Sequence, residues 1–281
     1  MKTEKYEKIP FSKLRRSSLD AGRLSRHKNI VHGLLEVDVT TACRALDYEH
    51  PRNGEQISFT AFIIYCLGKA IKKHKHLHAY MNWRKQLVIF EHVNIVAMIE
   101  SKLDDIRVPV PHLFKAVDTA DLLEIHQEIR YVQAHTKLLP GTRYLRWFYR
   151  LPGSLRLLLS TLVLKVPHWF RKYSSPAMVT SVGMFDRAAG WGIPKSSFTL
   201  TVTIGGITKK PWIVNGQIAI RDILHLTLSI DHDIVDGAPA TRFVHDLRTL
   251  IESGAGLPGC WQLAEKVEDL PQDENVKYAV S

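Results

Sequence analysis

The sequence predicts an α+β domain in which a β-sheet packs with helices. Residues 224–231 alternate between apolar and polar side chains, which is typical of a half-buried strand. Residues 61–71 instead repeat apolar side chains at helical spacing. The chain has 281 residues, of which 45% are hydrophobic, so it can hold one large domain or two small ones with an ordinary core.

The first elements of the chain alternate between strand and helix. Residues 33–40 combine alternation with β-branched side chains, so we expect a strand. Residues 51–54 contain proline and glycine, which predicts a loop. Ser58 then opens the long helix that contains residues 61–71.

Two short strands and a helix are expected next. Residues 87–90 and 93–99 have the composition of strands. A helix follows, with Asp118 or Thr119 as its cap and an apolar face between residues 122 and 132.

Three alternating histidines, His74, His76 and His78, follow the long helix and raise the question of a metal site. Metal ligands two residues apart suit a strand, whereas this run follows a helix, and no cysteine or carboxylate accompanies it. We therefore interpret the run as a solvated helix end and expect no metal ion.

A basic and apolar segment spans about residues 138–176. It contains two apolar helical blocks, at 144–151 and 155–166, and no acidic residue occurs between Ile129 and Phe185. The apolar run is shorter than the ~20 residues that span a bilayer. Basic charge beside Trp147, Phe148 and Trp169 is typical of a helix at a membrane surface. We favour the alternative, a helical hairpin packed on its own domain or on a neighbouring subunit.

The C-terminal half predicts a strand at 198–204 and a hairpin that turns at Asn215–Gly216. The alternating strand at 224–231 follows. Gly237 is expected to break that strand, Pro239 to lie in the first turn of a helix, and Gly254 to end the helix.

The corner between this strand and helix carries a histidine motif. It reads His-x-x-x-Asp-Gly, from His232 to Asp236 and Gly237. A histidine can act as a general base near neutral pH, and a rigid corner fixes its direction. From these residues alone, a surface loop with a solvated histidine is an equal alternative.

Residues 228–243 resemble the active-site segment of the 2-oxo acid dehydrogenase dihydrolipoamide acyltransferases. The resemblance covers most of residues 9–136 and 177–260. It implies a chloramphenicol acetyltransferase-like sandwich of a mixed β-sheet with helices. The catalytic domain would span residues 1–264, with the helical insertion 138–176 inside it and a polar tail at 265–281. The sequence contains no lipoyl-type domain, swinging-arm motif or subunit-binding module, so we expect a stand-alone catalytic domain.

The resemblance implies a role for several residues. His232 would be the general base, and Thr180 would donate a hydrogen bond to the oxyanion of the tetrahedral intermediate, with Ser181 as the alternate.

Asp236 would pair with Arg15, for which Arg16 is the nearby substitute, and Gly237 completes the motif. One position departs from the family, because Asp233 stands where an arginine usually follows the histidine.

The activity implied is transfer of an acyl group between coenzyme A and a thiol acceptor of the dihydrolipoamide type. A lipoyl group would be supplied in trans by a lipoyl or carrier protein. The family forms homotrimers with active sites between subunits, and assembly into a larger cage is left open. Asp233 and the insertion both indicate an acceptor other than a housekeeping lipoyl domain.

Composition limits the alternatives. Three widely spaced cysteines (Cys43, Cys66 and Cys260) argue against a disulfide framework and for a reducing compartment, so we expect a cytoplasmic protein. The net charge of +10 and the insertion keep open a non-catalytic trimeric scaffold, or a protein attached peripherally to membranes. Nucleic acid is not an expected partner because no recognised motif accompanies the charge. Peptide-synthetase condensation domains need two such lobes, for which the chain is too short.

Overall fold

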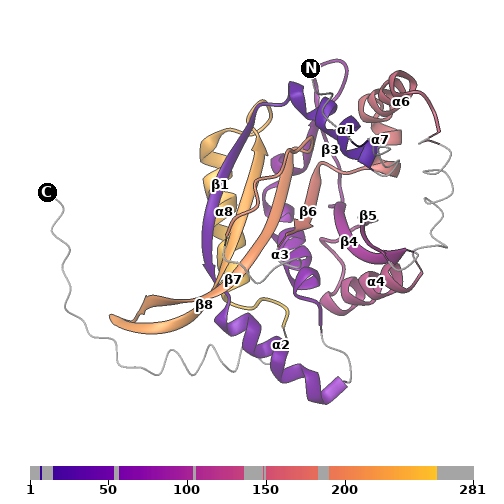
Figure 1. The fold of residues 1–281 in the computed structure, drawn as a ribbon. Coiled ribbons are helices and arrows are strands. Elements are labelled where there is room, and N and C mark those ends of the chain that lie inside the picture. The colour runs from indigo at the N-terminus through magenta and orange to yellow at the C-terminus, as the bar shows by residue number, and fades with distance from the viewer. Residues whose placement is uncertain are drawn as a thin grey trace, which may run out of the picture.

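The computed structural model describes residues 7, 15–53, 57–103, 106–135, 148, 150–182 and 190–257. A six-stranded sheet with the strand order β1-β8-β7-β6-β4-β5 forms its centre, and β2 and β3 form a small second sheet (Figure 1). The strands are β1 (Ile30–Asp38), β2 (Ala79–Met81), β3 (Leu87–Ile89), β4 (Ile95–Leu103), β5 (Ile106–Phe114), β6 (Ala177–Ser181), β7 (Leu200–Val214) and β8 (Gln217–Asp231). Because β6 runs parallel to both of its neighbours and the other pairs are antiparallel, the sheet is mixed, and the predicted α+β class is confirmed.

Helices cover the apolar face of the sheet. The helices are α1 (Arg15–Leu24), α2 (Thr40–Asn53), α3 (Phe59–Lys73), α4 (Leu122–Ala134), α6 (Gly153–Lys165), α7 (Pro167–Tyr173) and α8 (Gly237–Glu252), with short 3-10 turns at Ser25–His27 and Lys75–His78. Helix α3 contributes nine buried residues and packs between α4 and α8 (Figure 1). One apolar cluster joins α3 to side chains of β6, β7 and β8, such as Val179, Val202 and Leu226. Burial of this face holds the sheet rigid.

Strands β7 and β8 form one long hairpin of 15 residues on each side. The predicted turn is confirmed, since Asn215 and Gly216 both have positive φ angles, of 51° and 78°. We expected a short strand at 198–204 and a separate hairpin. In the structure both belong to the single hairpin of β7 and β8. A bulge interrupts the β7 register between Ile204 and Ile207, where a Cβ on Gly205 would lie 2.3 Å from the carbonyl oxygen of Gly190.

The expectation that residues 224–231 are only half buried was wrong. Every residue of β8 from Ile223 to Asp231 is buried. Two side chains on the polar side of the strand find polar partners in the interior: His225 Nδ1 lies 2.9 Å from the carbonyl oxygen of Gly206, and Ser229 Oγ lies 2.8 Å from His32 Nδ1. The alternation in the sequence thus reflects a difference in chemistry between an apolar face and a polar face that are both buried.

Two predicted helix ends also differ from the structure. Helix α2 continues to Asn53, through most of the expected loop at 51–54. Helix α4 is capped by Asp121, with Glu124 completing the capping box, and neither Asp118 nor Thr119 is the cap. The Asp118 carboxylate is used elsewhere, because it accepts the backbone N–H of Val93 at 2.8 Å.

The histidine run is a solvated helix end only in part, because His76 is exposed whereas His74 and His78 have partners in the domain. His78 is 1% exposed, its Nε2 lies 2.8 Å from the carbonyl oxygen of Asn94, and burial lowers its pKa to about 4. His74 Nε2 lies 2.9 Å from Asp246 Oδ2. Within the described ranges, no three histidine, cysteine or acidic side chains gather in a way that could hold a metal ion.

The insertion contributes α6 and α7, which pack on the domain near α1 (Figure 1). Helix α6 is the second predicted helical block, whereas most of the first block, 144–151, and the predicted tail at 265–281 lie outside the described residues. Arg156 on α6 forms a buried ion pair with Asp20 on α1, at 2.7 Å. Among the helices that the structure describes, none has the length and apolar character to cross a bilayer.

Candidate active site

His232 follows the last residue of β8 and opens a turn that leads to α8. The predicted position of the histidine, on a corner between a strand and a helix, is confirmed. The predicted role of Gly237 was wrong, because the strand ends at Asp231 and Gly237 is the first residue of α8. A Cβ on Gly237 would meet nothing within 4 Å, so the fold of one copy does not require glycine there.

A buried ion pair fixes this corner. Lys28 Nζ lies 2.5 Å from Asp231 Oδ2, and the Asp231 side chain is 1% exposed. The other carboxylate oxygen accepts the N–H of Asp233 at 3.3 Å, and the backbone N–H of His232 donates to the carbonyl oxygen of Asn29 at 2.8 Å. Residues 28 and 29 thus hold both the backbone and the buried charge of the corner, since a buried carboxylate needs a close cation and hydrogen bonds.

Lys28 and Asp231 are site residues that sequence reasoning missed. An acidic residue on the strand next to the histidine is a detectable signal. Its partner is not detectable, because Lys28 lies 203 residues away in the chain.

The His232 imidazole is exposed and makes no hydrogen bond within the described part of the chain. Its ring is therefore accessible to a substrate, as a general base must be.

Asp236 is the N-cap residue of α8 through its carbonyl oxygen, which accepts the N–H of Ala240 at 3.1 Å. Its exposed side chain makes no capping hydrogen bond. The predicted partner Arg15 begins α1, but its side chain and that of Arg16 lie outside what the structure describes, so this pair stays a prediction.

Thr180 and Ser181 lie at the end of β6 and point to opposite faces of the sheet. Thr180 pairs with Thr203 of β7, which pairs with Thr227 of β8, so three hydroxyl side chains form a row on the polar face. The buried Oγ1 atoms of Thr203 and Thr227 have no hydrogen-bond partner in the described structure. Ser181 pairs with Ile204 and shares the apolar face.

His232 and Thr180 do not meet within one copy of the chain. The N–H of Asp231 donates to Thr199 O, which places the His232 corner opposite that residue of β7. Thr180 lies on β6, the strand on the far side of β7 from β8. It pairs with Thr203, which is four residues after Thr199 along β7. Strand geometry then separates the two backbones by about 16 Å, from about 3.3 Å per residue and about 4.8 Å per strand. Each group needs contact at about 3 Å with the reacting atoms, so one copy does not form a common site.

A cavity of about 210 Å³ adjoins the corner. Lys28 and Thr199 line one part of it, and Thr161, Leu164 and Lys165 of the insertion line another. Three aromatic side chains also line it: Tyr80, Phe198, and Phe170 of the insertion. The insertion therefore lies beside the histidine corner.

A known protein family matches most of the chain. The model of the family described as 2-oxoacid dehydrogenases acyltransferase (catalytic domain) matches residues 3–138 and 174–257. The match is interrupted over the segment that holds α6 and α7.

Curated relatives match over shorter shares of their own length. A dihydrolipoyllysine-residue succinyltransferase component of the 2-oxoglutarate dehydrogenase complex, from Buchnera aphidicola, is 21% identical over 206 residues, which are 73% of this chain and 41% of the relative. A lipoamide acyltransferase component of the branched-chain alpha-keto acid dehydrogenase complex, from Pseudomonas aeruginosa, is 38% identical over 83 residues, or 30% of this chain and 19% of the relative. The chain thus spans less than half the length of these relatives.

Solved structures show the same fold. A probable dihydrolipoamide acetyltransferase from Listeria monocytogenes superposes with a TM-score of 0.65 at 21% identity, over 88% of this chain and 94% of that chain. A truncated catalytic core of the 2-oxoacid dehydrogenase multienzyme complex from Thermoplasma acidophilum gives a TM-score of 0.63 at 22% identity, over 89% of this chain and all of that chain.

Proposed function

We infer the function of this chain from its family: the chain belongs to the 2-oxoacid dehydrogenase acyltransferases, through their catalytic domain. It transfers an acyl group between coenzyme A and a thiol acceptor of the dihydrolipoamide type. The observation that carries the proposal is the exposed His232 imidazole, held on a clamped corner between β8 and α8.

His232 acts as the general base. A thiol becomes a strong nucleophile when it loses its proton. The neutral imidazole takes that proton as the sulfur attacks the thioester carbonyl, and the carbonyl oxygen becomes an oxyanion. When the tetrahedral intermediate collapses, the carbon–sulfur bond of the original thioester breaks, and the imidazolium returns the proton to the departing thiolate. Acyl-coenzyme A is thus the acyl donor in one direction of the reaction and the product in the reverse direction.

Thr180 stabilises the oxyanion by donating its hydroxyl hydrogen. Such a donor lowers the barrier by about 3 kcal/mol in comparable sites. The separation of His232 and Thr180 along and across the sheet supports a site assembled from two copies, with one group from each. We propose the homotrimer for this assembly, and a larger cage as its next level.

The acceptor is a lipoyl group or a similar thiol on a separate carrier protein. The cavity beside the corner supports a role for the insertion in selecting it, because Leu164 and Lys165 line the cavity together with Lys28. Asp233, exposed next to the base, presents a negative charge to an incoming acceptor.

The test is an assay of thiol release from acyl-coenzyme A, with free dihydrolipoamide as acceptor and a range of acyl chains. We expect His232→Ala to lower turnover by about 10²- to 10⁴-fold, because the general base is lost. His245→Ala is the matched control, since His245 is an exposed histidine farther along α8 and its loss leaves turnover unchanged. Equal turnover of the His232→Ala variant and the wild type would refute the mechanism.

A second candidate function is a non-catalytic scaffold that attaches peripherally to membranes. Helix α6 favours it, because Leu155, Leu158 and Leu162 recur at helical spacing and are 40%, 57% and 43% exposed. Absence of turnover in a well-folded trimer, with every acyl chain and a lipoyl protein as acceptor, would favour this candidate.

A further inference from the structure

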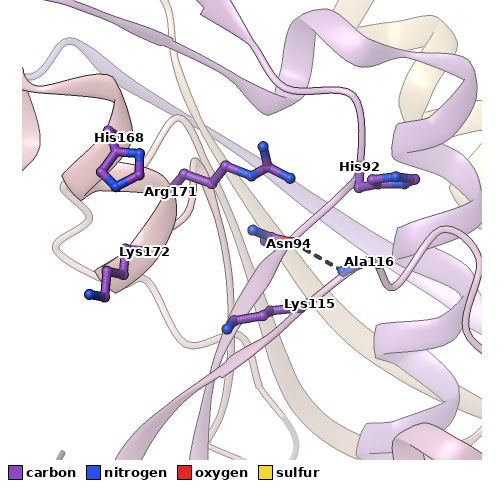
Figure 2. A pocket seen from close by; sticks show the side chains of 7 residues that line it. All are labelled: His92, Asn94, Lys115, Ala116, His168, Arg171 and Lys172. Carbon is purple, nitrogen blue, oxygen red and sulfur yellow. Dashed lines mark hydrogen bonds between the residues drawn. The ribbon is translucent and has the colours of Figure 1, made fainter.

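A second cavity, of about 340 Å³, lies where α7 of the insertion meets the ends of β4 and β5. His92, Asn94 and Lys115 line one side, and His168, Arg171 and Lys172 of α7 line the other (Figure 2). It shares no lining residue with the cavity beside the His232 corner. His168, Arg171 and Lys172 also fall in the segment that the family match leaves out.

The lining of this cavity is strongly basic. Lys115, Arg171 and Lys172 carry basic side chains, and no carboxylate is among the lining residues. Within the described ranges none of these three cations has an ion pair, although Lys172 Nζ lies 5.3 Å from the ring centre of Tyr173. Cations that border one cavity without ion-pair partners offer favourable electrostatic contacts to a bound anion.

Asn94 adds a directed hydrogen-bond donor. Its side chain is largely buried, with 7% of the residue exposed, and its Oδ1 accepts the backbone N–H of Ala116 at 3.0 Å. That bond leaves the amide nitrogen facing away from Ala116, toward the space that Arg171 and Lys115 border (Figure 2). The lining groups are therefore cations, histidines and a donor, which complement a multiply charged anion. A carboxylate lies behind one of them, since His92 Nδ1 is 3.6 Å from Asp118 Oδ2.

The α7 side of the cavity is held in place by an aromatic stack. Phe170 is 5% exposed, and its ring lies 4.1 Å from the ring of Tyr80 at an interplanar angle of 12°. Arg171 and Lys172 follow this anchored residue directly. The backbones that carry the cations on both sides are thus fixed before any ligand arrives, which lowers the cost of binding.

We propose that this cavity binds a phosphate-bearing anion. Phosphate carries two negative charges and several acceptor oxygens, and a guanidinium can donate to it in a bidentate manner. A soluble phosphate ester and the headgroup of an anionic phospholipid offer the same chemistry. The proposal does not depend on acyl transfer.

The experiment measures binding to the full chain with two kinds of probe. The first is inorganic pyrophosphate, titrated by calorimetry at low salt. The second is a phosphatidylcholine vesicle with or without phosphatidic acid, followed by co-sedimentation. Arg171→Ala and Lys115→Ala remove one cation from each side of the cavity. Lys209→Ala is the matched control, because Lys209 is an exposed lysine on β7 and does not line the cavity.

We expect each cavity variant to weaken binding about tenfold, and the Lys209→Ala control to bind like the wild type. Pyrophosphate binding with this pattern identifies a soluble phosphate ester as the ligand class, and vesicle binding alone identifies a lipid headgroup. The proposal is overturned if neither probe binds, or if Lys209→Ala weakens binding as much as Arg171→Ala does, since that result indicates diffuse charge attraction.

Discussion

Asp231, directly before the proposed base, is held in a buried ion pair with Lys28. A charge with a 1% exposed side chain is tolerable only with a close partner, and Lys28 lies 2.5 Å away. The pair acts on the chemistry indirectly, by fixing the turn from which the His232 imidazole projects. We therefore propose both as positioning residues, which act through the turn that they hold.

Lys28→Met tests this role through stability. The substitution leaves the Asp231 carboxylate buried without its counter-charge, so we expect a loss of about 2 kcal/mol in the free energy of unfolding. This value is lower than for a fully buried pair because the Lys28 side chain is 29% exposed. Urea denaturation measures the change. Lys209→Met, which removes an exposed lysine, is the control, and an equal, small effect of both substitutions would contradict the role of the pair.

At this scale the sequence predicted the corner on which the proposed base lies, but not the residues that support it. The motif around His232 is local, and its resemblance to a family made the residue identifiable. Lys28 is an ordinary lysine in the sequence, and only the fold brings it to Asp231. The roles of Thr180, Asp236 and Arg15 likewise stay predictions that rest on the resemblance.

The family match is interrupted over the segment that holds helices α6 and α7. One is tied to α1 by the Arg156–Asp20 ion pair, and the other is anchored by Phe170. Together they line the cavity at the His232 corner and the basic cavity. The insertion is therefore part of both candidate sites.

Phe170→Ala is expected to release α7 from the domain. The substitution removes the stack on Tyr80 and leaves a void, which costs about 3 kcal/mol. We expect trypsin to cleave after Arg171 and Lys172 about a hundredfold faster, because cleavage follows the open population of the segment. Trp169→Ala is the neighbouring control, since that side chain is 46% exposed. Equal cleavage rates of the two variants would contradict the proposed anchor.

Elements with a strong periodic pattern were predictable, and their ends were not. The pattern identified β8, α3, α6 and α8, because each places an apolar face against the core. The cap of α4 was misplaced by two or three residues, because Asp118 and Thr119 were the expected caps and Asp121 is the actual one. The Asp118 carboxylate instead accepts the backbone N–H of Val93. The burial of both faces of β8 was hidden because polar side chains that pair in the interior resemble solvated ones in the sequence.

At the scale of the whole molecule, we propose that one chain supplies one half to each of two different sites. His232 lies at the end of β8, and Thr180 lies two strands away and four residues farther along the sheet. A periodicity or motif within one sequence does not indicate how two copies meet. The proposal of a site shared between copies therefore rests on the family resemblance and on the strand register. The account predicts that acyl transfer requires two copies in contact.

Complementation between two inactive variants tests that claim most directly. His232→Ala and Thr180→Val are each expected to lack most activity, and the two are co-expressed in equal amounts and purified as mixed assemblies. In a trimer with a head-to-tail interface, about a quarter of the interfaces then pair an intact His232 with an intact Thr180. We predict that thiol release from acyl-coenzyme A returns to about a quarter of the wild-type rate. Mixed assemblies that remain as inactive as either variant alone would contradict a site shared between copies.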